Sequence, residues 1–186
     1  MTRIVAGSLG GRRIAVPPRG TRPTSERVRE AMFSAISARI DLAGARVLDC
    51  YAGSGALGIE ALSRGASFAL FVESDRRAAA VLAENLAVLG LSGFAEVRTS
   101  SVEALAGSRP AWDPFDLLVA DPPYAVSGAA LSSVLASLAG HGWLAPGALL
   151  TIERPARTAE LAWPNDVEQI TTRRYGDTLV CYGRRP

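Results

Sequence analysis

The chain has 186 residues, of which 48% are hydrophobic and 20% are charged, and its formal net charge is +2. This length and composition predict one globular domain, and no apolar run approaches the ~18 to 20 residues that a membrane-spanning helix needs. The first residues lack the apolar core of a secretion signal, so we expect a cytoplasmic protein without a membrane partner.

Positive charge is concentrated near the N-terminus. Residues 1–29 contain seven arginines and one acidic residue, whereas residues 30–186 contain thirteen arginines and seventeen acidic residues. This imbalance is typical of a basic arm that contacts phosphate groups. A solvated surface that only keeps the protein in solution is the alternative. We expect residues 1–23 to form the arm and residues 24–186 to form the main domain.

The arm is predicted to be a small β-hairpin. Residues 4–6 and 14–16 are apolar and flank the glycine-rich stretch 7–11, which suits a turn. From Thr24 onward, apolar residues recur with helical spacing, at positions 28, 31, 32, 35 and 36. Thr24 or Ser25 can cap this helix, and Glu26 lies in its first turn.

After residue 44, short apolar strands alternate with helices. Strands are expected at 47–50, 69–72, 95–99 and 115–120, each followed by a helix, which indicates a parallel sheet covered on both faces. A fifth strand at 149–152 precedes a hairpin formed by 167–172 and 178–182. We therefore predict an α/β, Rossmann-like sheet that ends in an antiparallel pair, the layout of seven-stranded methyltransferases.

The cysteines and the histidine do not suggest a metal site. Cys50 and Cys181 lie far apart, each within an apolar stretch, and His141 is the only histidine. We predict two buried, reduced thiols and no metal.

A glycine-rich loop follows the first strand of the sheet. The stretch VLDCYAGSGALGIEALSRGA places Gly53, Ser54 and Gly55 between that strand and a helix, where glycine permits a tight turn and close approach of a ligand. Together with Gly58, these glycines match the dinucleotide fingerprint, and Glu73 stands where a ribose-binding acid is expected. A nicotinamide-dependent oxidoreductase is therefore one interpretation.

Asp49, in the strand ahead of the loop, favours a different cofactor. A carboxylate there suits a cationic ligand better than a pyrophosphate, which prefers free amides and positive dipoles. The chain also leaves no room for a second, substrate-binding domain. S-adenosylmethionine, with its ammonium, sulfonium and ribose, fits both Asp49 and Glu73. We expect this cofactor, with S-adenosylhomocysteine as its product.

The sequence DPPY, residues 121–124, directly follows the fourth strand. Ligands of open α/β sheets bind beyond the carboxyl ends of the strands, so Asp121 is expected to face the same crevice as the glycine loop. The Asp121 carboxylate and the Pro122 carbonyl can accept hydrogen bonds from an exocyclic amine, which favours a nitrogen lone pair directed at the methyl donor. Pro123 helps to fix the loop, and Tyr124 can stack on an extruded base. These residues predict methylation of an amine.

Five sequence blocks, in this order, resemble the RsmD family of 16S ribosomal RNA guanine-N2 methyltransferases: RIVAGSLGGRRIAVPP, TRPTSERVREAMF, VLDCYAGSGALGIEALSRGA, FVESDRRA and DPPY. The resemblance covers almost the whole chain. It implies a class I S-adenosylmethionine-dependent fold with an N-terminal hairpin extension. It further implies methylation of N2 of one guanine, guanine 966 in the usual rRNA numbering. Related motifs occur in enzymes acting on DNA adenine or protein glutamine, which remain alternatives.

The resemblance also assigns roles to residues. The cofactor-binding residues would be Asp49, Gly53, Ser54, Gly55, Glu73 and Ser74. Ser101 and Val102 stand where many relatives carry Asp or Asn, so we expect the Val102 main chain to contact the adenine. The RNA-binding residues would be Arg3, Arg12, Arg13, Arg19, Arg22 and Thr24. The expected partner is 16S rRNA within the 30S subunit or its assembly intermediate, with ribosomal proteins as further contacts.

Overall fold

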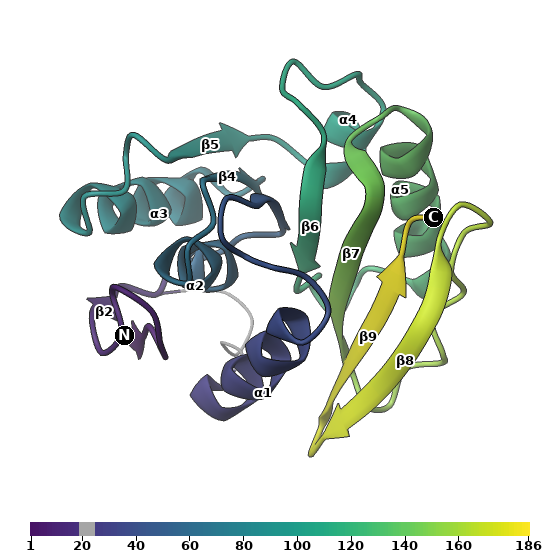
Figure 1. Cartoon of the computed structure of the whole chain (residues 1–186), viewed down its shortest axis with the longest axis horizontal. Helices are drawn as coiled ribbons and strands as arrows, with labels where there is room; N and C mark the ends of the chain where they lie inside the picture. Colours follow the sequence, from purple (N-terminus) through teal and green to yellow (C-terminus); the bar gives the residue numbers. More distant parts are fainter. Residues whose placement is uncertain (19–24) are drawn as a thin grey trace.

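The protein is described by a computed structural model, which covers residues 1–18 and 25–186. The main sheet contains β3 (Arg46–Cys50), β4 (Phe68–Glu73), β5 (Ala95–Thr99), β6 (Phe115–Ala120), β7 (Leu144–Pro155), β8 (Glu168–Tyr175) and β9 (Thr178–Arg184). Their order is β5-β4-β3-β6-β7-β9-β8 (Figure 1). β9 is antiparallel to both of its neighbours, and the pairs from β5 to β7 are parallel. The expected parallel sheet with an antiparallel end is therefore present.

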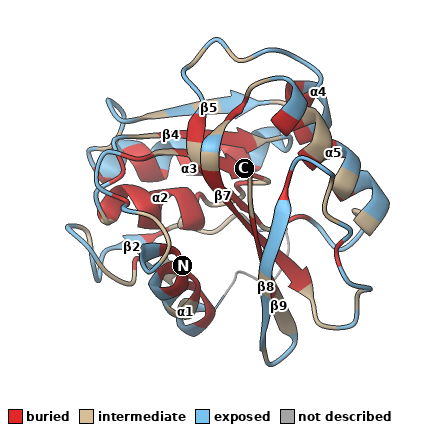
Figure 2. Cartoon of the chain, turned by 45° about the vertical axis from the view of Figure 1, so that its right-hand side comes forward, coloured by how far each residue is buried: buried red, intermediate tan, exposed pale blue. Residues whose placement is uncertain are grey.

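Helices cover both faces of this sheet. The helices α1 (Glu26–Ser37), α2 (Ala56–Ser63) and α3 (Arg76–Val88) pack on one face, and α4 (Val102–Ala106) and α5 (Gly128–Gly140) pack on the other. Figure 2 shows the central strands buried, whereas β5 and β8 at the edges of the sheet are largely exposed. Because successive side chains of a strand point to opposite faces, Val47 of β3 joins the first core and Leu48 joins the second.

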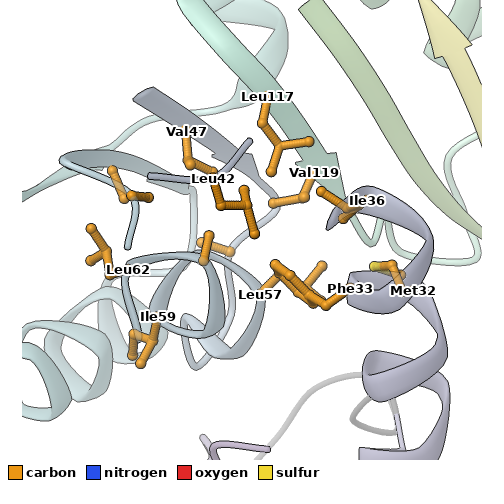
Figure 3. Close-up of a cluster of buried hydrophobic side chains, with 14 of the residues drawn as sticks. Met32, Phe33, Ile36, Leu42, Val47, Leu57, Ile59, Leu62, Leu117 and Val119 are labelled. Carbon is orange, nitrogen blue, oxygen red and sulfur yellow. The ribbon is translucent and has the colours of Figure 1, made fainter. Parts of the chain in front are cut away.

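The first core connects α1 and α2 to the middle of the sheet. Met32 and Phe33 of α1 lie near Leu57 of α2, below Leu117 and Val119 of β6 (Figure 3). The cysteines behave as predicted, since both are buried and reduced, and Cys50 packs in the second core.

The N-terminal hairpin exists, but its strands are shorter than the predicted residues 4–6 and 14–16, and each begins earlier in the chain. β1 (Thr2–Arg3) pairs with β2 (Arg13–Ile14) in an antiparallel manner. Ile4 still bonds to the backbone of Gly11 and Arg12, and side chains of the main domain bind the backbone groups that follow. The Glu60 carboxylate accepts hydrogen bonds from the N–H groups of Val5 and Ala6 at 2.7 and 3.0 Å.

The hairpin also has no core separate from the main domain. Ile4 and Ile14 are buried in the same cluster as the side chains of α1, α2 and α3. Figure 1 shows the hairpin beside α2, close to α3. The arm is thus anchored by its apolar side chains, while Arg3, Arg12 and Arg13 are exposed.

Helix α1 begins as predicted, with Ser25 as its cap. The Ser25 hydroxyl accepts a hydrogen bond from the N–H of Val28 at 3.2 Å, whereas Thr24 lies outside the described residues. Arg29 of this helix is fully buried and donates hydrogen bonds to the Thr2 hydroxyl and the Arg3 carbonyl. One of the seven N-terminal arginines therefore holds the arm in place instead of facing solvent.

The C-terminal strands are longer than predicted. β7 has 12 residues, where the sequence indicated only 149–152, because it pairs with β6 on one side and β9 on the other. The longest helices of the described chain, α3 and α5, have 13 residues each. None of the described helices has the length and the apolar character needed to cross a bilayer.

Candidate active site at the carboxyl ends of the strands

A cavity of about 370 Å³ opens at the carboxyl ends of β3, β4 and β6. Nine residues predicted from the sequence line it: Asp49, Gly53, Ser54, Glu73, Ser74, Ser101, Val102, Asp121 and Pro123. They come from four separate loops and strand ends that are far apart in the sequence. The parallel topology brings them together, as expected for an open α/β sheet.

The glycines of the loop have different roles. Gly53 has a φ of +55°, and a Cβ added to it would meet nothing within 4 Å, so it leaves room next to the cavity. Gly55 has a φ of +81°, and its added Cβ would lie 2.2 Å from Cδ1 of Leu82. Gly55 is not among the cavity-lining residues. Its lack of a side chain lets α3 pack against the loop.

Asp49 is buried at the base of the cavity and fixes the loop. Its Oδ2 accepts a hydrogen bond from the N–H of Gly58, in the first turn of α2, at 2.8 Å. Burial raises the pKa of Asp49 well above its usual value; the Gly58 hydrogen bond lowers it, and the nearby charges of Asp121 and Glu73 raise it further. The side chain thus lies within the electrostatic reach of two other carboxylates.

Glu73, at the end of β4, is held by two backbone groups. Its Oε2 accepts a hydrogen bond from the N–H of Gly53, and its Oε1 accepts one from the N–H of Asp75, both at 2.8 Å. Each carboxylate oxygen keeps a second lone pair for another donor. Because the Gly53 amide is already used, it is not free for a pyrophosphate, which argues against the nicotinamide alternative.

The DPPY segment directly follows β6. Asp121 is half-buried, Pro122 is buried, and Pro123 is exposed. The side chain of Tyr124 is 71% exposed. Asp121 also borders a smaller hollow, which Tyr124 and Glu153 line with four other residues. Asp121 therefore stands between the main cavity and a second recess that contains an exposed aromatic ring.

Ser101 and Val102 lie at the start of α4. The Ser101 hydroxyl accepts a hydrogen bond from the N–H of Ala104 at 3.1 Å and so caps this helix.

Glu103 also lines the cavity and accepts a hydrogen bond from the Tyr51 hydroxyl at 3.3 Å. Sequence reasoning missed both residues, although their signals were present: Tyr51 directly follows the first strand, and Glu103 is next to the expected adenine contact.

Two further residues of the cavity wall, Val16 and Pro17, were assigned to the arm by the sequence. They follow β2 and line the same cavity as Ser54 and Glu73. The block RIVAGSLGGRRIAVPP contains them but indicates the arm and not a cofactor contact, because that contact depends on how the arm folds back onto α3.

The arginines predicted to bind RNA differ in their surroundings. Arg12 and Arg13 are exposed on the hairpin. Arg3 is exposed too, but its Nη2 lies 2.7 Å from Oε2 of Glu26 in an ion pair. This hydrogen bond is the main cause of the lowered pKa of Glu26. Arg19, Arg22 and Thr24 lie outside the described residues. Over residues 1–18 and 25–186, no group of three or more potential ligands could hold a metal ion.

The strand order, the glycine loop and the acidic strand ends define the class I methyltransferase fold. The fold predicted from the sequence is confirmed. Residues 2–184 match the family described as Conserved hypothetical protein 95, and the chain belongs to this family.

Proteins from several bacteria are similar in sequence to this chain. "Ribosomal RNA small subunit methyltransferase D" of Escherichia coli (strain K12) is 39% identical over 152 residues, which cover 81% of this chain and 73% of the relative. The protein of the same name from Haemophilus influenzae is 39% identical over 155 residues, which cover 81% and 77%. These relatives confirm the expected resemblance and the methyltransferase class.

A solved structure extends the match to the whole chain. "Putative methyltransferase yhhF from Escherichia coli" superimposes with a TM-score of 0.86 and 32% identity, covering 99% of this chain and 97% of that one.

Proposed function

We propose that this chain transfers the methyl group of S-adenosylmethionine to the N2 amine of a guanine in 16S rRNA and leaves S-adenosylhomocysteine. The observation that carries this proposal is the position of Asp121 in the wall of a cavity that also contains Asp49 and Glu73. An acceptor for a target amine thus shares one space with two acids suited to a cationic cofactor. The names of the relatives support rRNA of the small subunit as the substrate. Guanine 966 is the specific target that the resemblance to the RsmD family implies.

The residues of the cavity fit S-adenosylmethionine. Asp49, Glu73 and Asp121 raise the negative potential there, which favours a ligand with an ammonium and a sulfonium. The free lone pairs of Glu73 can accept hydrogen bonds from ribose hydroxyls, and the open side of Gly53 permits close approach. When bound, this cofactor supplies a methyl group activated by the positive charge on sulfur.

Asp121 acts on the amine that receives the methyl group. An exocyclic amine of a nucleobase is a weak nucleophile because its lone pair is delocalised into the ring. Hydrogen bonds from its N–H groups to the Asp121 carboxylate and the Pro122 carbonyl favour a pyramidal nitrogen with an available lone pair. The N2–carbon bond then forms as the sulfur–carbon bond breaks. The surplus proton leaves N2 after methylation, when the amine has become acidic.

Tyr124 offers a surface for the base. Its exposed ring can stack on a guanine that has left its neighbours, and such stacking contributes about 1–3 kcal/mol. This offsets part of the cost of unstacking, which is on the order of a few kcal/mol.

Glu153 can select guanine over adenine in the same recess. Ala120 pairs with Ile152 in the sheet, so Asp121, directly after β6, and Glu153, within β7, are neighbours. Guanine carries an N–H at N1 beside its N2 amine, and the Glu153 carboxylate can accept a hydrogen bond from that N–H. Adenine has a lone pair at N1, which a carboxylate would repel.

The RNA is expected to approach over the arm. Arg12 and Arg13 are exposed near the cavity wall formed by Val16 and Pro17, where they can contact phosphate groups. The substrate would be the 30S subunit or its assembly intermediate in the cytoplasm, with ribosomal proteins as neighbours.

Transfer of a tritiated methyl group tests this function. The purified protein is incubated with labelled S-adenosylmethionine and 30S subunits from a strain that lacks the modification, and the labelled nucleotide is identified by mass spectrometry. We expect N2-methylguanine in 16S rRNA, and Glu153→Gln should slow its formation. Label in adenine, in DNA or in a protein amide would refute the proposal. Calorimetry with S-adenosylmethionine and with NADH should detect binding of the former only.

A further inference from the structure

The arm forms part of the wall of the cofactor cavity. Val16 and Pro17 line it together with Gly53 and Ser54 of the glycine loop, and only two residues separate Arg13, exposed at the start of β2, from Val16. A movement of the arginine-bearing strand would therefore move this wall as well.

Asn85 of α3 connects the arm to the glycine loop. Its side-chain amide is buried, with 5% exposure. The Ala15 N–H donates to Oδ1 at 2.8 Å, and Nδ2 donates to the Ala15 carbonyl at 2.9 Å and to the Ser54 carbonyl at 3.0 Å. The oxygen and the NH₂ group cannot be exchanged, because two partners are carbonyls and one is an N–H. These hydrogen bonds therefore fix the orientation of the Asn85 amide toward both the arm and the glycine loop.

Other anchors of the arm do not reach the loop. Glu60 binds the N–H groups of Val5 and Ala6, and the Ser63 hydroxyl accepts from the N–H of Leu9 at 3.0 Å. Neither Glu60 nor Ser63 lines the cavity. Among residues 1–18 and 25–186, Asn85 is the side chain that hydrogen-bonds to both the arm and the glycine loop.

We propose that Asn85 is a positioning residue that couples RNA binding on the arm to cofactor binding in the cavity. This inference rests on the function proposed above. RNA that holds Arg12 and Arg13 also holds Ala15, and Asn85 relays that restraint to the Ser54 carbonyl and so to the loop that faces the cofactor. Coupling of this kind is reciprocal: if RNA tightens cofactor binding, the cofactor tightens RNA binding by the same factor.

Asn85→Asp tests the relay with little change in shape. The new carboxylate still accepts from the Ala15 N–H, but it places an oxygen against the Ala15 and Ser54 carbonyls, which then lose their donor. We expect the Kd for S-adenosylmethionine to rise about tenfold. We also expect its KM to rise, while kcat at saturating cofactor stays within about twofold. The effect of 30S subunits on cofactor affinity, about fivefold or more in the wild type, should disappear.

Ser63→Ala is the matched control. It removes hydrogen bonds to the arm at Leu9 and Ala6 but touches neither Ala15 nor the loop. Cofactor affinity and coupling should both remain within about twofold of wild type. An equal loss in Ser63→Ala would mean that any loosening of the arm has this effect, and it would overturn the role of Asn85. So would wild-type affinity and coupling in folded Asn85→Asp.

Val16→Ala provides a second test if Asn85→Asp does not fold. It trims the cavity wall and leaves the buried hydrogen bonds in place, so cofactor affinity should fall about threefold. Unchanged affinity would show that the arm does not contribute to cofactor binding. Because cofactor affinity is measured by calorimetry without methyl transfer, failure of this relay is distinguishable from failure of the proposed activity.

Discussion

The two halves of the candidate site, the cofactor cavity and the recess after β6, differ in how firmly their side chains are held. In the cofactor half, at the ends of β3 and β4, backbone N–H groups fix the carboxylates of Asp49 and Glu73. In the target half, after β6, the Tyr124 ring projects into solvent. A small cofactor thus meets groups that are already oriented, whereas a base within a large RNA meets an open surface to which it must be brought.

Removing Asp121 should produce the largest effect, since it stands where the halves meet. We expect Asp121→Ala to reduce kcat by about 10²- to 10³-fold, as for other groups that act mainly on the transition state. Binding of S-adenosylmethionine should persist. Methyl transfer and calorimetry on the same preparation separate the two quantities. An undiminished rate in the folded variant would remove the catalytic role of the target half.

The open surface of the target half is tested at Tyr124. Because base stacking contributes about 1–3 kcal/mol, Tyr124→Ala should lower kcat/KM by about 5- to 150-fold. Tyr124→Phe keeps the ring and serves as the control, with activity within about twofold of wild type. Steady-state kinetics with 30S subunits measures both. If the two variants lost activity equally, the hydroxyl rather than the ring would be required.

The cofactor half is tested by pH. A cationic ligand prefers ionised Asp49, and burial raises the pKa of this group. Protonation therefore removes its attraction at a higher pH than for an ordinary Asp. Affinity for S-adenosylmethionine should fall as the pH is lowered through that raised pKa. Calorimetry across a pH series measures the fall.

Asp49→Asn separates the contribution of the Asp49 charge to cofactor binding from the contributions of Glu73 and Asp121. The variant should bind S-adenosylmethionine about tenfold more weakly at neutral pH, which corresponds to about 1.4 kcal/mol, and with a flatter pH profile. A profile identical to that of the wild type would assign the titration to another carboxylate.

The smallest effect is expected outside both halves, on the arm. Replacing Arg12 and Arg13 with Ala should weaken RNA binding and reduce the salt slope by about 1 to 2, since each lost phosphate contact contributes about 0.7 to 0.9. Cofactor affinity without RNA should not change. Binding assays over a salt series provide the measurement, and an unaltered slope would exclude these side chains from the RNA contact.

The arrangement of the sheet could be predicted because its signals are local. Apolar runs separated by helical spacing located β3 to β6, and the position of DPPY after β6 followed from the topology. Interactions between distant segments could not be predicted in this way. The ends of the hairpin strands depend on Glu60, and the burial of Arg29 depends on contacts with Thr2 and Arg3.

In the candidate site, too, local patterns could be predicted and contacts between distant segments could not. The glycine spacing indicated a ligand loop, yet the pattern could not show that Gly55 makes room for Leu82 while Gly53 faces the cavity. Val16 and Pro17 belong to a sequence block that indicates the arm, and their place in the cavity wall results from how the arm folds.

The anchoring of the hairpin affects how its role can be studied by deletion. A chain shortened by its first eighteen residues would lose more than positive charge, because Glu60 would keep its ion pair with Arg64 but lose two backbone donors. The core would also lose Ile4 and Ile14. Failure of such a shortened protein to modify RNA would therefore mix structural damage with missing recognition, and substitutions confined to the outward-facing arginines are the cleaner genetic tool.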